Sequence, residues 1–177
     1  QATKILEKAT AENCEVVLPF DVIVASEFTE GASTETVLIE AVPEDCMILD
    51  IGPASISDLK RRLLDCKTVV WNGPLGAYDH PTNHDYAEGS LELAQLLFEE
   101  ALVNQNFSVV IGGGDSAAIL NKIGASQLKN LIRRCIEKQL AEPINHDLIS
   151  MKFSVDDCYV LWNYLSSNFF ISTGGGA

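Results

Sequence analysis

The sequence lacks the features that mark membrane, secreted and disordered proteins. No apolar run approaches the roughly 20 residues of a membrane-spanning helix, and the first residues do not have the basic-then-apolar order of a secretion signal. Of the 177 residues, 47% are apolar and 21% are charged, which is typical of a globular protein. We therefore expect one folded domain with a sizeable core, in the cytoplasm.

Paired cysteines are also missing. The five cysteines are widely spaced, and no two form a C-x-x-C pair: Cys14, Cys46, Cys66, Cys135 and Cys158. This pattern favours reduced thiols over a zinc ribbon or a redox motif. His80, His84 and Asp85 have the residue types of a metal site. Pro81 and Asn83 between them indicate a loop instead of one helix face, so metal ligation is the less favoured alternative.

Basic residues are scarce. The chain has 12 Lys and Arg against 25 Asp and Glu, for a formal charge of −13. Such a surface repels the phosphates of nucleic acids and anionic membranes, so we expect neither as a partner. A polyphosphate site in this chain would need backbone N–H groups and a metal ion in place of cationic side chains.

Short apolar segments alternate with helical segments along most of the chain. Strand character is found at 16–25, 47–51, 67–71, 107–111 and 168–171, and helical character at 3–13, 55–66, 90–104 and 116–122. Ser55 or Ser57 is the expected cap of the second helix. The alternation predicts an α/β fold with a doubly wound, Rossmann-like parallel sheet covered on both faces. Ligands in such folds bind in the loops after the strands, here 52–55, 72–79, 112–116 and 172–177.

The loop after 107–111 carries three glycines and a carboxylate. Gly112, Gly113 and Gly114 allow a ligand to approach the backbone, and the start of the next helix favours an anion. Asp115 would repel a bare phosphate but can hold Mg²⁺ that bridges to phosphate oxygens, and Ser116 can add a hydrogen bond. A tight turn in which Asp115 caps the helix is an equally weighted alternative.

The same loop also has the spacing of a dinucleotide fingerprint, through Gly112, Gly114 and Ala117. That fingerprint requires an acidic residue at the end of a second strand about 20 residues further on. Glu137 lies at that distance but in a basic helical segment, 128–140, so dinucleotide binding is the less favoured interpretation.

Two other strand ends carry glycine-rich turns. Asn72 is followed by the rigid Gly73–Pro74 turn and by Asp79, a possible acceptor for ribose hydroxyls. The segment 172–177 follows the last predicted strand. Two glycine loops in one sheet can supply converging N–H donors to a transferring group.

Four motifs in this order resemble the phosphoglycerate kinase family: LDIGPAS (49–55), TVVWNGPLGAYD (68–79), VVIGGGDSAA (109–118) and ISTGGGA (171–177). LPFDVIVASEF (18–28) is similar to the family segment that precedes them. The resemblance covers about residues 1–124 and 168–177. It implies part of a C-terminal, nucleotide-binding domain. The whole enzyme would transfer a phosphoryl group between 1,3-bisphosphoglycerate and Mg-ADP, giving 3-phosphoglycerate and ATP in glycolysis.

The resemblance also implies roles for individual residues. Asn72 and Pro74 would line the adenine nucleotide site, and Asp115 would be the Mg²⁺-associated carboxylate. Ser116 replaces a usual Thr. The backbone N–H groups around the glycines would stabilise the transferring phosphoryl group, with Gly112 and Gly113 on the nucleotide side and Gly114, Gly174 and Gly175 as the catalytic set.

The sequence departs from the family pattern in three places. Asp79 stands where the family usually has a longer ribose-binding Glu, and Ile48 stands where a Gly is common near the adenine, which would narrow the pocket. Residues 125–167 exceed the usual connection by about 40 residues. We interpret them as a helical insertion whose basic face is either solvated, the favoured interpretation, or a docking surface.

The family's substrate-binding domain, with its basic patch, has no counterpart in the sequence. We therefore expect a fragment that is cut short at both ends and inactive alone, from a protein that is monomeric when intact. The missing basic parts would explain why basic residues are scarce. The alternative is a non-catalytic module that binds nucleotide or docks through 125–167.

Overall fold

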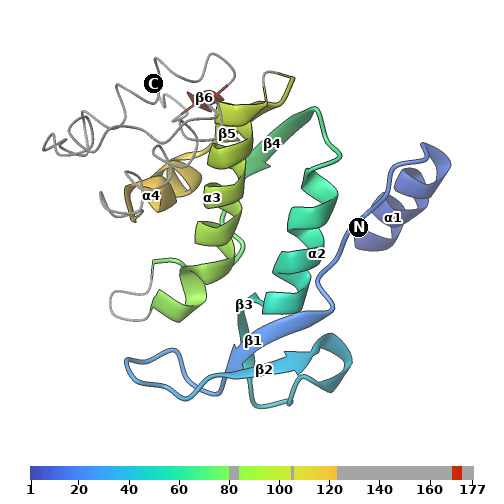
Figure 1. The fold of residues 1–177 in the computed structure, drawn as a ribbon. Coiled ribbons are helices and arrows are strands. Elements are labelled where there is room, and N and C mark those ends of the chain that lie inside the picture. Colours follow the sequence, from blue (N-terminus) through green and yellow to red (C-terminus); the bar gives the residue numbers. More distant parts are fainter. Residues whose placement is uncertain (80–83, 105, 123–168, 173–177) are drawn as a thin grey trace, which may run out of the picture.

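The described part of the chain consists of two small sheets with two helices between them. The computed structural model describes residues 1–79, 84–104, 106–122 and 169–172. An antiparallel sheet lies at one end and a parallel sheet at the other (Figure 1). Helices α2 (Pro53–Leu63) and α3 (Glu88–Val103) pack side by side between the sheets, whereas α1 (Ala2–Ala11) lies to one side and buries no residue.

The parallel sheet contains three strands in the order β4-β5-β6. They are β4 (Thr68–Asn72), β5 (Ser108–Gly112) and β6 (Phe169–Ser172), and α4 (Gly114–Lys122) follows β5. Each strand lies within one residue of its expected position. The prediction of an α/β fold with a parallel sheet is therefore confirmed.

The other three strands form a separate antiparallel sheet in the order β2-β1-β3. They are β2 (Glu35–Leu38), β1 (Asp21–Ala25) and β3 (Met47–Ile51), and a short 3₁₀ helix, η1 (Ile39–Ala41), follows β2. We had expected β1 and β3 to belong to the parallel sheet. Parallel neighbours need a long crossover, usually an α-helix, whereas the chain between β1 and β3 carries only β2, the short η1 and turns. The segment therefore folds back on itself as antiparallel strands.

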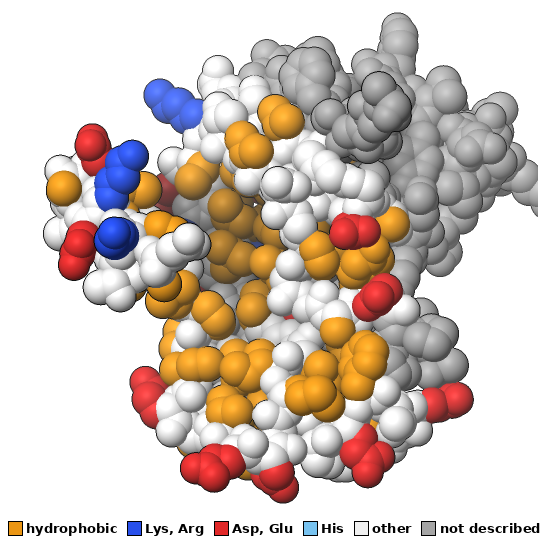
Figure 2. All heavy atoms as spheres, turned by 180° about the vertical axis from the view of Figure 1, so that it is seen from behind, with side chains coloured by type: hydrophobic (Ala, Val, Ile, Leu, Met, Phe, Trp, Pro, Cys, Tyr) orange, Lys and Arg blue, Asp and Glu red, His pale blue; other side chains and the backbone are white. Residues whose placement is uncertain are grey.

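The main core lies between α3 and the parallel sheet. Apolar residues of α3, among them Leu93 and Leu97, pack against Trp71, Val109 and Ile111. Burial alternates along β4, because Val70 points the other way and is 70% exposed. In the described residues β4 is thus covered on one face, whereas we had expected helices on both. From behind, apolar side chains gather in a central hollow and over the antiparallel sheet below it, with acidic side chains along the lower edge (Figure 2).

The start of α2 is capped from another strand. The carboxylate of Asp21, in β1, accepts the N–H groups of Ala54 (3.0 Å) and Ser55 (2.7 Å). In return the buried Ser55 hydroxyl accepts the N–H groups of Phe20 and Asp21 and donates to the Asp21 carbonyl. Burial raises the pKa of Asp21, but these hydrogen bonds outweigh that effect and hold the pKa below its usual value. The expectation that Ser55 or Ser57 caps α2 was wrong, because Pro53 begins the helix and a distant carboxylate caps it.

Two further features of the described residues concern membrane spans and thiols. Within residues 1–79, 84–104, 106–122 and 169–172, no helix is both long and apolar enough to cross a membrane. Cys14, Cys46 and Cys66 are free thiols, and the remaining two cysteines lie outside the described residues.

The exchange of hydrogen bonds between Asp21 and Ser55 predicts an asymmetry between the two serines of α2. Ser55→Ala leaves two N–H groups near β1 without their acceptor and should lower the free energy of unfolding by about 1–3 kcal/mol. Ser57→Ala, on the exposed side of the same helix, should change it by less than about 0.5 kcal/mol. Urea unfolding measures both, and equal effects would contradict the role of the Ser55 hydroxyl as the acceptor of these N–H groups.

Candidate functional site

The carboxyl ends of the three parallel strands lie next to one another. The register pairs Asn72 of β4 with Gly112 of β5, and Gly112 with Ser172 of β6. The loops 72–79 and 112–116, singled out from the sequence, therefore begin side by side at one edge of the sheet. Gly174 and Gly175 lie beyond Ser172, outside the described residues.

The side chain of Asn72 packs against the glycine loop. A Cβ atom on Gly113 would lie 3.0 Å from the Asn72 Oδ1, and one on Gly112 would lie 3.7 Å from it. Gly113 also has φ = +90°, a conformation that side chains disfavour. A Cβ on Gly114, the first residue of α4, would meet no atom of the other described residues within 4 Å beyond its own helix, so the described part of the chain leaves room for a ligand there. The glycines thus serve two purposes: close packing against Asn72 and open space at the helix start.

Ser116 joins the two loops. Its side chain is fully buried, and its hydroxyl accepts the N–H of Gly73 at 2.8 Å. Gly73 has φ = +101°, and its carbonyl accepts the indole N–H of Trp71 at 2.6 Å. The sequence did not indicate this joining role. A contact between Ser116 and a nucleotide stays a prediction.

Asp115 lies inside the first turn of α4 with its side chain exposed. Its Oδ1 accepts a hydrogen bond from the hydroxyl of Tyr78 at 2.9 Å, and this bond, more than burial, raises the pKa of Tyr78. The helix begins at Gly114, before Asp115. The alternative interpretation, in which Asp115 is the N-cap of this helix, is therefore wrong.

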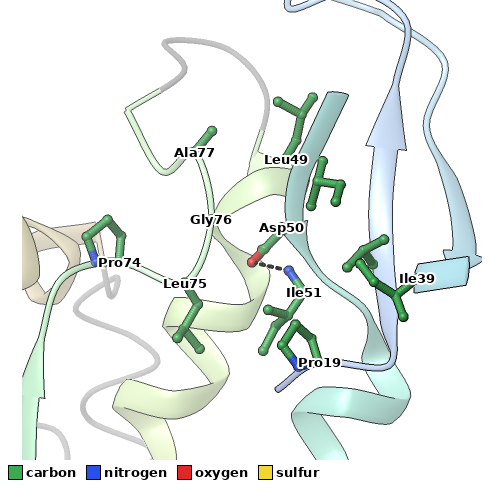
Figure 3. Close-up of a pocket in the computed structure, with 11 residues that line it drawn as sticks. Pro19, Ile39, Leu49, Asp50, Ile51, Pro74, Leu75, Gly76 and Ala77 are labelled. Carbon is green, nitrogen blue, oxygen red and sulfur yellow. Dashed lines mark hydrogen bonds between the residues drawn. The ribbon is translucent and has the colours of Figure 1, made fainter. Parts of the chain in front are cut away.

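A cavity of about 360 Å³ lies between β3 and the loop 72–79 (Figure 3). Its wall is mainly apolar, and Ile48 of β3 and Pro74 of the loop both contribute to it. The other lining residues are Pro19, Val22, Ile39, Leu49, Asp50, Ile51, Leu75, Gly76 and Ala77. Asp79, the last residue of the loop, is exposed and is not part of this lining.

Asp50 fixes the loop that closes this cavity. The side chain is 1% exposed, and its carboxylate accepts the N–H groups of Ile51 (2.8 Å) and Gly89 (3.0 Å). A Cβ on Gly76 would overlap this carboxylate, and one on Gly89 would lie 2.7 Å from its Oδ1. One buried carboxylate thus contacts β3, the cavity loop and the first turn of α3.

The environment of Asp50 changes its acidity. Burial raises its pKa to about 6, assisted by the charge of Glu88, whereas the N–H groups of Gly89 and Ile51 act in the opposite direction. Burial dominates because a carboxylate loses hydration when it is removed from water.

The cavity has few charges. No Lys or Arg is among its lining residues, and the ion pairs of Lys60, Arg61 and Arg62 all involve acidic side chains away from that lining. In the described ranges no group of three or more His, Cys, Asp or Glu side chains could hold a metal by itself. An ion here would need ligands from a bound molecule in addition to Asp115.

The comparisons with known proteins agree on one family. The sequence model of phosphoglycerate kinase matches residues 1–132. The chain belongs to the phosphoglycerate kinase family. It is 44% identical to the phosphoglycerate kinase of Thermosynechococcus vestitus over 119 residues, which are 67% of this chain and 28% of that protein. With the enzyme of Cereibacter sphaeroides the identity is 44% over 127 residues, covering 71% and 31%.

A solved structure gives the same result. The phosphoglycerate kinase of Coxiella burnetii superposes with a TM-score of 0.61 at 33% identity, covering 68% of this chain and 29% of that one. The chain thus spans about three tenths of the length of the relatives it matches. The family match ends at residue 132, inside the segment 125–167 that we expect to be an insertion.

Several predicted features lie outside the described residues. They are the insertion 125–167 with its basic helical segment 128–140, Glu137, His80, and the glycines of the last motif. His84 lies in the 3₁₀ helix η2 (His84–Ala87), and Ala117 lies in α4. The structure adds two site residues that sequence reasoning missed, Asp50 and Tyr78. Both stand inside recognised motifs, but nothing in a motif says which member is buried.

The raised pKa of Asp50 predicts how stability depends on pH. A group that binds a proton more tightly when folded stabilises the protein as the pH falls, so the free energy of unfolding should gain about 2 kcal/mol from Asp50 between about pH 7 and about pH 4.5. Asp50→Asn should lose this component, and the exposed Asp65→Asn should keep it. Urea unfolding across this pH range measures the difference, and parallel profiles for all three proteins would refute the assignment.

Proposed function

We propose that the protein to which this chain belongs transfers a phosphoryl group between 1,3-bisphosphoglycerate and ADP, and that this chain supplies the nucleotide side of the site. The observation that carries the proposal is the register of the parallel strands, which brings the Asn72 and glycine loops together beside an apolar cavity. Membership of the phosphoglycerate kinase family supports the reaction. The products of the proposed reaction would be ATP and 3-phosphoglycerate, and the reaction would be a step of glycolysis.

In this proposal the adenine enters the cavity between β3 and the loop 72–79. A planar, largely apolar base suits a lining of proline and aliphatic side chains, to which Ile48 and Pro74 belong. Asn72 faces the glycine loop and can both donate and accept a hydrogen bond. Asp79, exposed beyond the cavity, is the candidate for the ribose hydroxyls.

The phosphates would lie at the start of α4. The N–H groups of Gly113 and Gly114 and the helix dipole favour negative charge there, and the described residues leave space at Gly114. Such donors stabilise the charge on a transferring phosphoryl group without making a bond to it. We assign the same role to Gly174 and Gly175, and we assign Gly112 to the wall behind the phosphates.

Asp115 fits Mg²⁺ that arrives with the nucleotide. Mg²⁺ is commonly held by one or two carboxylates together with substrate phosphates, and an exposed carboxylate without other acidic ligands matches that pattern. The ion would neutralise phosphate charge. Asp115 could then lie beside a polyphosphate in spite of its negative charge, because the ion would stand between the two.

The chain alone should bind without turning over. The phosphoglycerate would have to be bound by residues that correspond to the rest of the relatives' length, because the cavity lining has no Lys or Arg. A non-catalytic nucleotide-binding or docking module is the second candidate, favoured by the same scarcity of basic residues. In either case we expect a cytoplasmic protein that is monomeric when intact.

Titration of the 177-residue chain with ADP, with and without Mg²⁺, tests this proposal. We expect calorimetry to give tighter binding with Mg²⁺, and Asp115→Asn to reduce the gain by about tenfold or more. Asp65→Asn, an exposed acid outside the proposed site, is the matched control and should retain the gain.

A turnover assay on the same samples separates the two candidate functions. Absence of ADP binding would favour docking. Measurable turnover of 1,3-bisphosphoglycerate would contradict our expectation that the fragment is inactive.

Ile48 provides a test of the cavity. The side chain narrows the proposed adenine pocket from β3 and is 50% exposed, so its truncation should cost little stability. We expect Ile48→Ala to tighten ADP binding about fivefold, which corresponds to about 1 kcal/mol. Val70→Ala removes a β-branched side chain from an exposed strand position outside the lining and serves as control. Weaker binding in Ile48→Ala alone would mean that Ile48 contacts the base favourably.

A further inference from the structure

The hydrogen bond from Tyr78 to Asp115 connects the proposed base pocket with the proposed metal site. Tyr78 stands at the end of the cavity loop, and Asp115 stands in the first turn of α4, 37 residues away. The oxygen–oxygen distance of 2.9 Å is that of a formed hydrogen bond, and the acceptor is a carboxylate oxygen, which strengthens it.

The backbone next to each partner is fixed by hydrogen bonds and packing. On the Tyr78 side, the N–H of Ala77 donates to the Leu49 carbonyl at 2.8 Å, and Gly76 is packed against the buried Asp50. On the Asp115 side, the neighbouring Ser116 is fully buried and holds the N–H of Gly73. The phenol and the carboxylate therefore project toward each other from backbone that is fixed on both sides, so the bond sets the orientation of an otherwise exposed side chain.

We propose that Tyr78 is a positioning residue for the metal ion, whose hydroxyl holds Oδ1 of Asp115 so that Oδ2 faces the cation accompanying the nucleotide phosphates. The inference deepens the proposed function and rests on it. A carboxylate bound to a metal through one oxygen keeps the other as an acceptor. Hydrogen-bond partners of metal ligands typically contribute 10–100-fold to metal affinity, because they fix the ligand in its binding orientation.

The arrangement also couples the two parts of the nucleotide. A base in the cavity contacts the loop that ends in Tyr78, and Tyr78 orients the residue that meets the metal at the phosphates. By linkage, the factor by which Mg²⁺ strengthens ADP binding equals the factor by which ADP strengthens Mg²⁺ binding. Loss of the Tyr78 hydroxyl should lower this shared factor and leave metal-free ADP binding unchanged.

The test compares ADP affinity of the 177-residue chain without Mg²⁺ and at saturating Mg²⁺, for the unsubstituted protein, Tyr78→Phe, Asp115→Asn and the double variant. We expect Tyr78→Phe to reduce the Mg²⁺ factor about tenfold while metal-free affinity stays within about twofold. In the Asp115→Asn background, Tyr78→Phe should have no further effect on this factor. A merely structural role would instead lower the unfolding midpoint and weaken both affinities equally.

Trp71 offers a second readout that does not depend on activity. Its indole donates to the Gly73 carbonyl at the root of the same loop, and Trp162 is the other tryptophan in the sequence. In a Trp162→Phe background, the Trp71 fluorescence change on adding Mg²⁺ to the ADP complex should shrink in Tyr78→Phe.

The possible outcomes separate the inference from the proposal beneath it. If Mg²⁺ did not strengthen ADP binding in the unsubstituted protein, both the role of Tyr78 and the proposed function would be overturned. A normal factor that Asp115→Asn removes and Tyr78→Phe leaves intact would overturn the role of Tyr78 alone. A larger factor in Tyr78→Phe would also overturn it, because the phenol would then compete with the metal for Asp115.

Discussion

The geometry of the cavity depends on one buried carboxylate. Asp50 is 1% exposed, burial raises its pKa to about 6, and it accepts N–H groups from its own strand and from the first turn of α3. Two glycines make room for it, Gly76 in the cavity loop and Gly89 in α3. A hydrophobic residue here could fill the space, but it could not accept both N–H groups. The carboxylate therefore specifies how strand, loop and helix meet, even though its burial costs stability.

The sheet edge then determines which residues can act together. Because β4, β5 and β6 run parallel in register, Asn72, Gly112 and Ser172 come to the same edge, although the last two are 60 positions apart. The glycines at this edge accommodate both the Asn72 side chain and the turn into α4. Rigidity of the loops comes from the pairing of Ser116 with Gly73 and of Ser90 with Leu75. A site that relies on backbone N–H groups needs this rigidity, since such donors cannot reorient as side chains can.

Local patterns in the sequence predicted the parallel strands and the loops after them, because short apolar runs that end in glycine are typical of buried strands followed by tight turns. Long-range polar pairing escaped the same reasoning. The cap of α2 comes from Asp21, more than 30 residues earlier, and Ser55 is its partner instead of the cap itself. The antiparallel pairing of β1 with β3 likewise depends on the absence of an α-helix between them. Asp50 lay inside a recognised motif, but only the fold reveals that it is buried.

The charge of the chain and the chemistry proposed for it are compatible only if the nucleotide arrives with its metal. A formal charge of −13 opposes a free polyphosphate, and Asp115 adds a carboxylate where the phosphates would lie. Bound Mg²⁺ reverses the sign of that local interaction, because the same carboxylate then attracts the complex. Tyr78 matters in this balance. In the proposed site, a carboxylate held in one orientation would favour the metal complex. A freely rotating one would repel the free nucleotide just as strongly and would bind the complex less well. If the proposed function holds, the acidic surface and an oriented Asp115 would act in the same direction, by selecting the metal-bound nucleotide over the free one.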